Sequence, residues 1–448
     1  MTTFEEALAY LKDLTKFGFN LGLERITELL HRLDDPHVKE RPAYIHIGGT
    51  NGKGSTSVMV ARVLEAAGYR VGLFTSPHMH CYTERTQING KSITQGDVAQ
   101  LIDQFRPHLD AMVAEGYEHP TEFEVWTALS FMYFAHQAAD IVVLEVGLGG
   151  SIDSTNVVNP IVTCITNVSM DHMDYLGHTL RDIAAVKAGI IKPGVPLITA
   201  SENSDVLQVL SSTAEAVGAP LVQVAAQERD LSHTLMNQCH KVIWEPVEGG
   251  KEMVIHGRIG HYGPLMPPLA GKHQQANLAT AVALLETVLQ KGFLWEEKHL
   301  QEGLGRVTWP GRQERFGQFL LDGAHNVAGA QTLAQTLKED YPDWNKVLLI
   351  GMLADKEREK VVELLAPLAQ TVIVTRPNNP RSGDWEQLAA NVSRYCSQVQ
   401  VMPDVRDAVD QAWSEAQQLK GYSDKTLIVV TGSLYMVAEA REYIRQKC

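Results

Sequence analysis

From residue 43 onward, short apolar runs alternate with longer helical patterns, and this alternation leaves few folds open to the chain. Apolar residues fill each short run and then recur at helical intervals in the segment that follows it. This order is typical of a mostly parallel sheet covered by helices on both faces. In the first part of the chain the expected strands are 43–47, 69–74, 141–146 and 161–166, and the expected helices are 55–67, 123–136 and 180–191.

A second α/β rhythm begins near Phe319. Between the two rhythms, residues 227–269 are rich in His, Gly and Pro and indicate an antiparallel strand-and-loop excursion, and residues 277–289 indicate a helix. At roughly 100–200 residues per domain the chain corresponds to two or three domains. We predict two, residues 1–296 and residues 297–448. The strands expected in the second domain are 319–321, 347–350, 372–375, 399–402 and 427–431.

Charge and cysteine content exclude several classes of function. The chain has 39 Lys and Arg against 53 Asp and Glu, a net charge of −14, which excludes a bulk polyanion such as duplex DNA as partner. No stretch approaches the ~20 apolar residues that span a bilayer, and the first residues do not resemble a secretory signal. The five cysteines lie far apart without a CxxC pair, which supports neither a disulfide framework nor a zinc site. We therefore expect a cytoplasmic protein without nucleic-acid or membrane partners.

The strongest local motif is the glycine-rich segment Ile47-Gly-Gly-Thr-Asn-Gly-Lys-Gly-Ser-Thr56. It follows an expected strand and precedes an expected helix, which is the context of a phosphate-binding P-loop. Glycines let backbone N–H groups turn toward phosphates, and the helix N-terminus adds its positive end. Lys53 would reach the β- and γ-phosphates, and a hydroxyl of Ser55 or Thr56 would bind Mg²⁺. The motif predicts nucleoside triphosphate binding.

The spacing departs from GxxxxGK[ST] in two ways. Three residues separate Gly48 from Gly52, and Gly54 stands between Lys53 and the two hydroxyl residues. A glycine-rich strand-to-helix turn without a nucleotide is the alternative.

Glu145 is the candidate metal-binding acid. It lies near the end of an apolar strand, followed by glycines, and ligands gather at that edge of α/β sheets. A carboxylate in such a strand is costly unless it is paired or binds a metal. The alternative is that it caps the following loop.

Several motifs together resemble one family. These are LGLER (21–25), GTNGKGST (49–56), Thr75-Ser-Pro-His78, LEVGLGG (144–150), Asp171-His172, Asp322-Gly-Ala-His-Asn326 and TGSL (431–434). Their order is similar to that of folylpolyglutamate synthases and bifunctional dihydrofolate/folylpolyglutamate synthases, within the ATP-dependent Mur ligase superfamily. The resemblance covers nearly the whole chain. It implies a P-loop NTPase-like parallel-sheet N-terminal domain and a smaller Rossmann-like α/β C-terminal domain.

The resemblance implies an amide-forming ligase. ATP phosphorylates a substrate carboxylate, and the amino group of L-glutamate attacks the acyl phosphate, leaving ADP and phosphate. The second substrate would be a reduced folate, dihydropteroate or both, bound by a monomer. The residues implied to contact ATP are Asn51, Gly52, Lys53, Gly54, Ser55, Thr56, Asn277, Arg312 and Asp322.

The resemblance also implies two Mg²⁺ ions, the first held by Ser55, Ser76 and Glu145 and the second by His172, with Lys187 as a further metal ligand. Lys187 matches a lysine that the superfamily often carbamylates, which turns a donor-only ammonium into an oxygen ligand. A monovalent cation is implied as well, without a residue pattern to place it. A surface helix lysine is the alternative for Lys187. His172 has a core or surface role as its alternative, since Mg²⁺ prefers oxygen.

Asp322 and His325 resemble residues that complete the active site across a domain cleft. Arg312 has a solvated loop charge as its alternative, and Phe123 is equally plausible as core. Ser151 stands where many relatives carry an arginine, so Arg85 is a candidate replacement for that positive charge. The residues implied for the pterin-bearing substrate are Leu23, Glu24, Arg25, Thr121, Phe123, Ile152, Asp153 and Ser154.

Two rival functions remain at this point. A Mur ligase acting on a UDP-sugar peptide usually has a further N-terminal domain, and only about 40 residues precede the first expected strand. A nucleotide-gated switch would hydrolyse ATP slowly without regard to glutamate or folates. A second α/β domain with its own Asp322 and His325 fits a two-substrate enzyme better.

Overall fold

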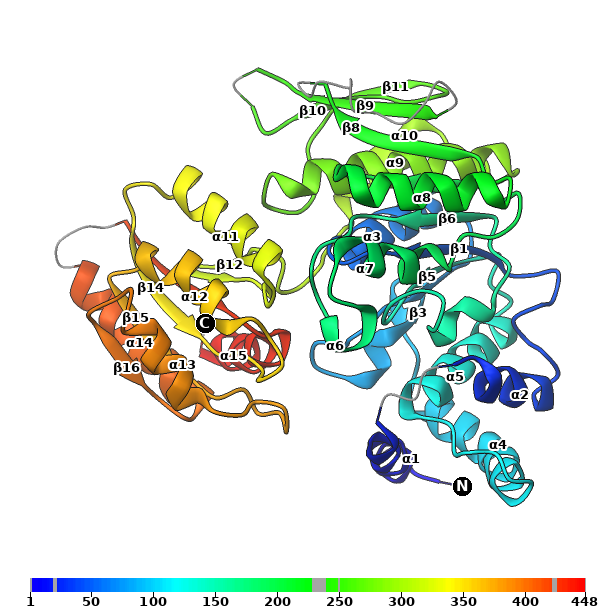
Figure 1. Cartoon of the computed structure of the whole chain (residues 1–448), viewed down its shortest axis with the longest axis horizontal. Helices are drawn as coiled ribbons and strands as arrows, with labels where there is room; N and C mark the ends of the chain where they lie inside the picture. Colours follow the sequence, from blue (N-terminus) through cyan, green and yellow to red (C-terminus); the bar gives the residue numbers. More distant parts are fainter. Residues whose placement is uncertain (1, 19–21, 228–238, 249, 421–424, 448) are drawn as a thin grey trace. The chain divides into compact units, whose positions relative to one another are not determined.

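The computed structural model of the chain describes residues 2–18, 22–227, 239–248, 250–420 and 425–447 (Figure 1). It divides into two compact units. The first comprises Met1–Pro268 and Gln275–Val307, and the second comprises Leu269–Gln274 and Thr308–Cys448. Helix α10 (Glu297–Gly305), which follows the predicted division after residue 296, packs against α3 (Lys53–Ala66) in the first unit.

The first unit is built on one large sheet. Its described strands follow the order β11-β10-β9-β8-β7-β6-β1-β5-β2-β3-β4. The strands from β9 to β2 along this order are parallel, and antiparallel hairpins extend the sheet at both ends. The strands are β1 (Ala43–Gly48), β2 (Val71–Phe74), β3 (Thr86–Ile88), β4 (Lys91–Ser92), β5 (Ile141–Glu145), β6 (Val162–Ile165), β7 (Leu197–Thr199), β8 (Leu221–Ala226), β9 (His240–Pro246), β10 (Met253–His256) and β11 (His261–Leu265).

The predicted strands of this sheet are confirmed, because each is a short apolar run buried on both faces. All of β5 is buried, and its register pairs Ile47 with Glu145. The antiparallel excursion is confirmed for β9, β10 and β11, and residues 228–238 and 249 of that prediction lie outside the described residues. Parallel strands end at the same edge, so the loop after β1 and Glu145 lie together there.

Helices cover both faces of this sheet (Figure 1). Trp126 and Phe131 of α5 join a core with Phe74 and Leu144, and α3 packs on β1, β2 and β5. The predicted helix 180–191 ends three residues early, at Ala188, where Gly189 caps it. The described α-helices are α1 (Phe4–Asp13), α2 (Glu24–Arg32), α3, α4 (Gln95–Ala114), α5 (Glu122–His136), α6 (Met173–Leu176), α7 (Leu180–Ala188), α8 (Ser204–Ala216), α9 (His273–Gln290) and α10.

The second unit has a smaller sheet of order β12-β13-β17-β14-β15-β16, antiparallel only between β12 and β13. All five predicted strands are confirmed. The three-residue hairpin strand β12 was not predicted from the sequence. The strands are β12 (Glu314–Phe316), β13 (Phe319–Leu321), β14 (Asn345–Ile350), β15 (Thr371–Val374), β16 (Val399–Val401) and β17 (Thr426–Thr431), and the α-helices are α11 (Val327–Glu339), α12 (Arg358–Leu365), α13 (Trp385–Val392), α14 (Val405–Lys420) and α15 (Leu434–Lys447).

Within the described ranges, no helix combines the length and apolar character that crossing a membrane requires.

A buried carboxylate ties the β10–β11 turn to α9. Glu286, fully buried, accepts hydrogen bonds from the backbone N–H groups of Arg258 (2.8 Å), Ile259 (2.9 Å) and Gly260 (3.1 Å) and from the Tyr262 hydroxyl (3.0 Å). Burial and the neighbouring Glu286 raise the pKa of Tyr262, which keeps this hydroxyl a donor. One side chain therefore accepts three backbone N–H groups of this turn.

Replacing Glu286 with alanine is expected to lower the free energy of unfolding by about 3 kcal/mol, because several donors at a partly buried turn lose their acceptor. Urea denaturation measures the change. The control is Glu302→Ala, which removes an exposed pair with Arg306 on α10 and is expected to cost less than about 0.5 kcal/mol. Equal effects of the two variants would show that Glu286 is not an anchor.

Candidate nucleotide and substrate site

The glycine-rich loop connects β1 to α3. Gly49 and Gly52 have φ angles of 132° and 86°, a region that favours glycine. A side chain at Gly49 would collide with Thr166, and one at Gly52 would collide with Asn277 of α9. The glycines are therefore required both by the backbone conformation and by neighbours that approach closely. Asn277, which is buried, therefore lies against the loop.

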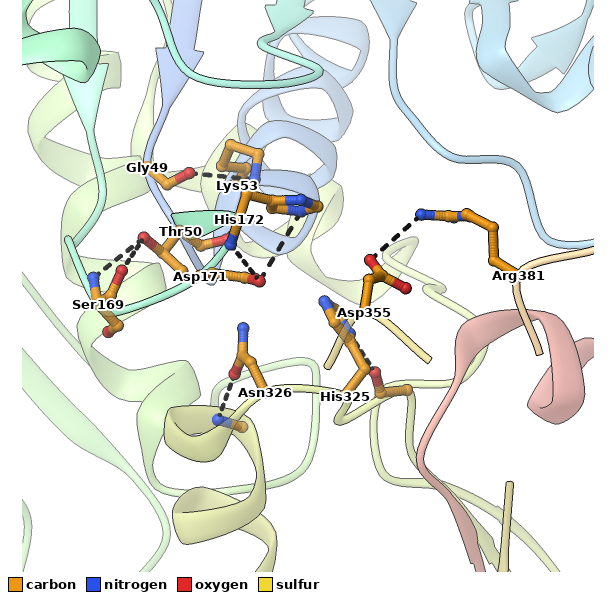
Figure 2. Close-up of polar contacts among 12 residues, drawn as sticks. Gly49, Thr50, Lys53, Ser169, Asp171, His172, His325, Asn326, Asp355 and Arg381 are labelled. Atoms are coloured by element: carbon orange, nitrogen blue, oxygen red, sulfur yellow. Dashed lines mark hydrogen bonds and ion pairs between the residues drawn. The ribbon is translucent and has the colours of Figure 1, made fainter. Parts of the chain in front are cut away.

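A segment after β6 braces this loop. Thr50 donates its N–H to the Asn167 carbonyl (2.8 Å), and Asn51 donates its N–H to the Asn167 side-chain oxygen (3.0 Å). The Thr50 hydroxyl also bonds to the backbone of Ser169 (Figure 2). This role of Asn167 was not predicted from the sequence. The available signal was its position directly after a strand that ends at the same edge as β1.

Lys53 lies over its own loop. Its ammonium donates to the carbonyl oxygens of Gly49 and Thr50, both at 3.1 Å (Figure 2). Ser55 and Thr56 are buried in the first turn of α3. The positive charge, the hydroxyls and the helix N-terminus therefore come together at one loop, an arrangement suited to a phosphate chain.

Glu145 and Ser76 meet at the same sheet edge. Glu145, 5% exposed, accepts a hydrogen bond from the Ser76 backbone N–H at 3.3 Å. Among the described residues, no group of three or more His, Cys, Asp or Glu side chains is arranged to hold a metal ion. Any Mg²⁺ here would thus rely on one carboxylate, hydroxyls, phosphate oxygens and water, which is how proteins commonly hold this ion.

His172 begins the short helix α6 in a left-handed conformation, with φ of 50°. Asp171 accepts the His172 backbone N–H at 2.9 Å, and its carboxylate lies 3.9 Å from Nε2 of the ring (Figure 2). The carboxylate therefore bonds to the histidine backbone and lies beside the ring.

Lys187 is buried rather than on the surface, so the surface-lysine alternative is wrong. It is 4% exposed, and its Nζ donates to the Gly49 carbonyl at 3.0 Å. Burial, helped by the positive charge of Lys53, lowers the pKa of Lys187 to about 7, against the opposing pull of Asp171 and Asp153. Two lysines thus converge on Gly49, and one of them holds a substantial neutral fraction near neutral pH.

Arg25 and Thr121 meet through Glu124. The Arg25 guanidinium contacts both oxygens of Glu124 at 3.2 Å. Thr121, the N-cap of α5, donates its N–H (2.7 Å) and hydroxyl (2.9 Å) to the same carboxylate. Glu124 therefore fixes two residues that the resemblance assigns to the substrate. Leu23 is half-buried beside them, and Glu24 is exposed.

Arg85 is held by an acid and an aromatic ring. Its Nη1 donates to Glu122 at 2.7 Å, and its guanidinium lies 4.6 Å from the centre of the Tyr82 ring. Its charge is therefore already compensated in this structure.

The loop after β5 is held internally. Asp153, buried, accepts the N–H groups of Leu148 (2.7 Å) and Thr155 (3.0 Å), and burial raises its pKa. Ser154 is buried, Ile152 is half-buried and Ser151 is exposed. Phe123 packs at the margin of the α5 core, and a side chain at Gly147 would collide with its ring. Phe123 therefore belongs in part to the core while it faces the glycine run.

In the second unit, Asp322 and His325 follow β13, and Arg312, which precedes β12, lies close to Asp322. Asp322 accepts the N–H groups of Ala324 (2.8 Å) and Gln313 (3.2 Å). Burial raises its pKa, and the positive charge of Arg312 opposes this shift. The Arg312 guanidinium lies over Gly323, where a side chain would approach its Nη1 to 2.8 Å.

His325 bonds through Nδ1 to the Gly323 carbonyl at 2.8 Å (Figure 2). Asp355 follows β14 and Arg381 follows β15, and the Arg381 Nη1 lies 3.5 Å from the Asp355 Oδ2 (Figure 2). Neither residue was predicted from the sequence. Charged side chains thus follow three strands of this sheet.

Comparisons with known proteins agree with these motifs. Residues 47–285 match the Mur ligase middle domain, and residues 305–434 match the Mur ligase glutamate ligase domain. The dihydrofolate synthase/folylpolyglutamate synthase of Bacillus subtilis is 32% identical over 457 residues, covering 99% of this chain and 100% of that protein.

Solved structures agree as well. FolC of Escherichia coli, in complex with DHPP and ADP, has a TM-score of 0.84 at 28% identity, covering 100% of this chain and 98% of that chain. The bifunctional folylpolyglutamate synthase/dihydrofolate synthase of Yersinia pestis, complexed with AMPPNP and Mn ion, has a TM-score of 0.82 at 27% identity, covering 99% and 98% of the two chains. The chain therefore belongs to the Mur ligase superfamily, in its branch of folylpolyglutamate and dihydrofolate synthases.

Proposed function

We propose that this chain is an ATP-dependent ligase that joins L-glutamate to tetrahydrofolate, with dihydropteroate as a second acceptor. The observation that carries the proposal is the convergence of Lys53 and Lys187 on Gly49, inside a phosphate loop whose sheet edge also holds Glu145 and Ser76. A UDP-sugar peptide ligase is not favoured, because the relatives that match the full chain are named as folate enzymes. A nucleotide switch is not favoured either, since the match extends through a glutamate ligase domain.

The proposed reaction proceeds in two steps. A substrate carboxylate oxygen attacks the γ-phosphorus of ATP, the bond to the β-phosphate oxygen breaks, and ADP leaves. The L-glutamate amino group then attacks the acyl carbon, loses a proton and displaces phosphate. Lys53 neutralises negative charge on the transferred phosphoryl group, and Asn277, Arg312 and Asp322 orient the nucleotide. The remaining loop contacts are proposed for Asn51, Gly52, Gly54, Ser55 and Thr56.

Divalent metal binding forms part of the proposal. Ser55, Ser76 and Glu145 offer the oxygen donors that Mg²⁺ prefers, and they would hold one ion. His172 and a carbamylated Lys187 would hold a second. Carbamylation needs a neutral amine to attack carbon dioxide, and the buried, pKa-lowered Lys187 supports it. When bound, these ions supply charge neutralisation for the phosphates.

The pterin-bearing substrate is proposed to bind in the first unit. Leu23, Arg25, Thr121 and Phe123 come from α5 and the start of α2, and the loop at residues 152–154 follows β5. The Glu124 carboxylate keeps Arg25 and Thr121 in place. Glu24 and Arg85 are assigned weaker, peripheral contacts, because one is exposed and the other is already paired. The chain is proposed to act as a monomer.

The test is ADP release by the purified protein with ATP, Mg²⁺ and L-glutamate. Tetrahydrofolate is expected to stimulate ADP release strongly, and dihydropteroate is expected to stimulate it as well. Omitting L-glutamate is the control and should remove the stimulation. Stimulation by dihydropteroate alone would restrict the activity to dihydrofolate synthesis. Silence with both acceptors would overturn the folate assignment and make Ser151 the first residue to examine.

A further inference from the structure

Arg312 sits in an unusual turn of the second unit. Its neighbours Gly311 and Gln313 both have left-handed backbone angles, with φ of 68° and 50°. Gln313 is not a glycine, so its conformation costs energy and persists only where surrounding interactions hold it. The position of the Arg312 side chain therefore depends on whatever fixes this turn.

Three hydrogen bonds hold the backbone of the turn. Gly311 donates its N–H to the Glu314 carboxylate (2.9 Å) and accepts the N–H of Gly323 (2.9 Å). Gln313 donates its N–H to Asp322 (3.2 Å). Gly323 and Asp322 lie in the segment after β13, and Glu314 lies at the start of β12. Glu314 is thus the only one of these carboxylates that the proposed function leaves without a role.

Glu314 is itself oriented from far along the chain. Arg441 of α15 makes a two-pronged pair with it, from Nε to one carboxylate oxygen (2.8 Å) and from Nη2 to the other (2.8 Å). Arg441 is 7% exposed, and its guanidinium lies 5.5 Å from the centre of the Phe316 ring. The oxygen that binds Nε also accepts the Gly311 N–H. Arg441 therefore fixes the position of the Glu314 oxygen that accepts the Gly311 N–H.

We propose that Arg441 is a positioning residue for nucleotide binding, acting through Glu314 on the turn that carries Arg312. This inference rests on the proposed function, which assigns Arg312 to ATP. Arg441 need not contact the nucleotide. A lysine at this position would keep the charge but could not satisfy both carboxylate oxygens in the same planar fashion. The Glu314 carboxylate would then rotate, and the Arg312 turn would lose one of its three restraints.

The test compares Arg441→Lys and Glu314→Gln with the wild-type chain. Each variant is expected to raise the KM for ATP and the Kd for ADP by about three- to tenfold, the effect of weakening roughly one hydrogen bond. The kcat and the KM for L-glutamate should stay within about twofold. Kd is measured by titration calorimetry and folding by thermal denaturation. The control is Lys447→Ala. Lys447 lies on α15, as Arg441 does, but its ion pair is with Asp410 of α14, so its loss should leave all these constants unchanged.

The double variant gives the sharpest result. If Arg441 acts through Glu314, the Arg441→Lys/Glu314→Gln chain should bind ADP no more weakly than the worse single variant. Additive losses would overturn the inference, as would unchanged ADP binding in both folded single variants. A parallel change of kcat and of every KM with a lowered Tm would show a merely structural role. Because ADP binding is measured directly, a wild-type chain that binds ADP without ligating folates would overturn the proposed function alone.

Discussion

The Lys53→Ala variant is expected to lose ligase activity by about 10³-fold in kcat, because the transferred phosphoryl group loses its nearest cation in a site made for charge neutralisation. The ammonium already lies at the loop, 3.1 Å from the Gly49 and Thr50 carbonyl oxygens. ADP release at saturating ATP, L-glutamate and tetrahydrofolate measures the loss. Lys91→Ala, on the exposed strand β4, is the matched control and should retain full activity. Near-normal turnover of Lys53→Ala would remove Lys53 from the phosphate site.

The Lys187→Ala variant is expected to lose about 10²-fold or more in kcat and to recover part of it when a small carboxylate such as acetate is added. The added anion would replace the oxygen ligand that a carbamate supplies. Intact-mass analysis of the wild-type chain in bicarbonate buffer should show one added carbon dioxide, which the variant lacks.

Lys192→Ala is the control for rescue. Lys192 also has a pKa lowered by burial, but its ammonium bonds to the Asn156 carbonyl (3.1 Å) rather than to the phosphate loop. Acetate should not change its activity. Full activity of Lys187→Ala, or a loss that no anion rescues in a folded chain, would make Lys187 a structural residue.

Part of the fold could be predicted, because burial leaves a visible pattern in several strands. The strands 141–145 and 426–431 are continuous apolar runs because helices cover both of their faces. The strands β3, β4 and β12 escaped prediction, because two or three residues carry no periodicity and depend on pairing with a neighbour. The buried strands β7 and β8 were not predicted either, although apolar residues make up most of each. Predicted helix ends shifted by a few residues, as with Ala188, since local capping decides them.

The loops of the candidate site could be predicted from the sequence, but the residues that hold these loops in place could not. The glycine spacing and Lys53 predict a phosphate loop, because the residues that would contact phosphate are neighbours in the sequence. The partners that hold the loop and the Arg312 turn, Asn167 and Arg441, lie more than a hundred residues away from them. No local pattern encodes such a pairing. The burial of Lys187 was equally hidden, since its helix begins with exposed polar residues.

The short segment Leu269–Gln274 makes the second unit discontinuous in sequence. Lys272 of this segment forms an ion pair with Glu339 at 3.0 Å, and a side chain at Gly271 would lie 2.8 Å from Gln313. A chimaera of two relatives joined only at residue 308 would therefore combine residues 269–274 of one parent with residues 308–448 of the other. Chimaeras that exchange residues 269–274 together with residues 308–448 should fold normally. Chimaeras joined only at residue 308 would have mismatched contacts between residues 269–274 and the Arg312 turn.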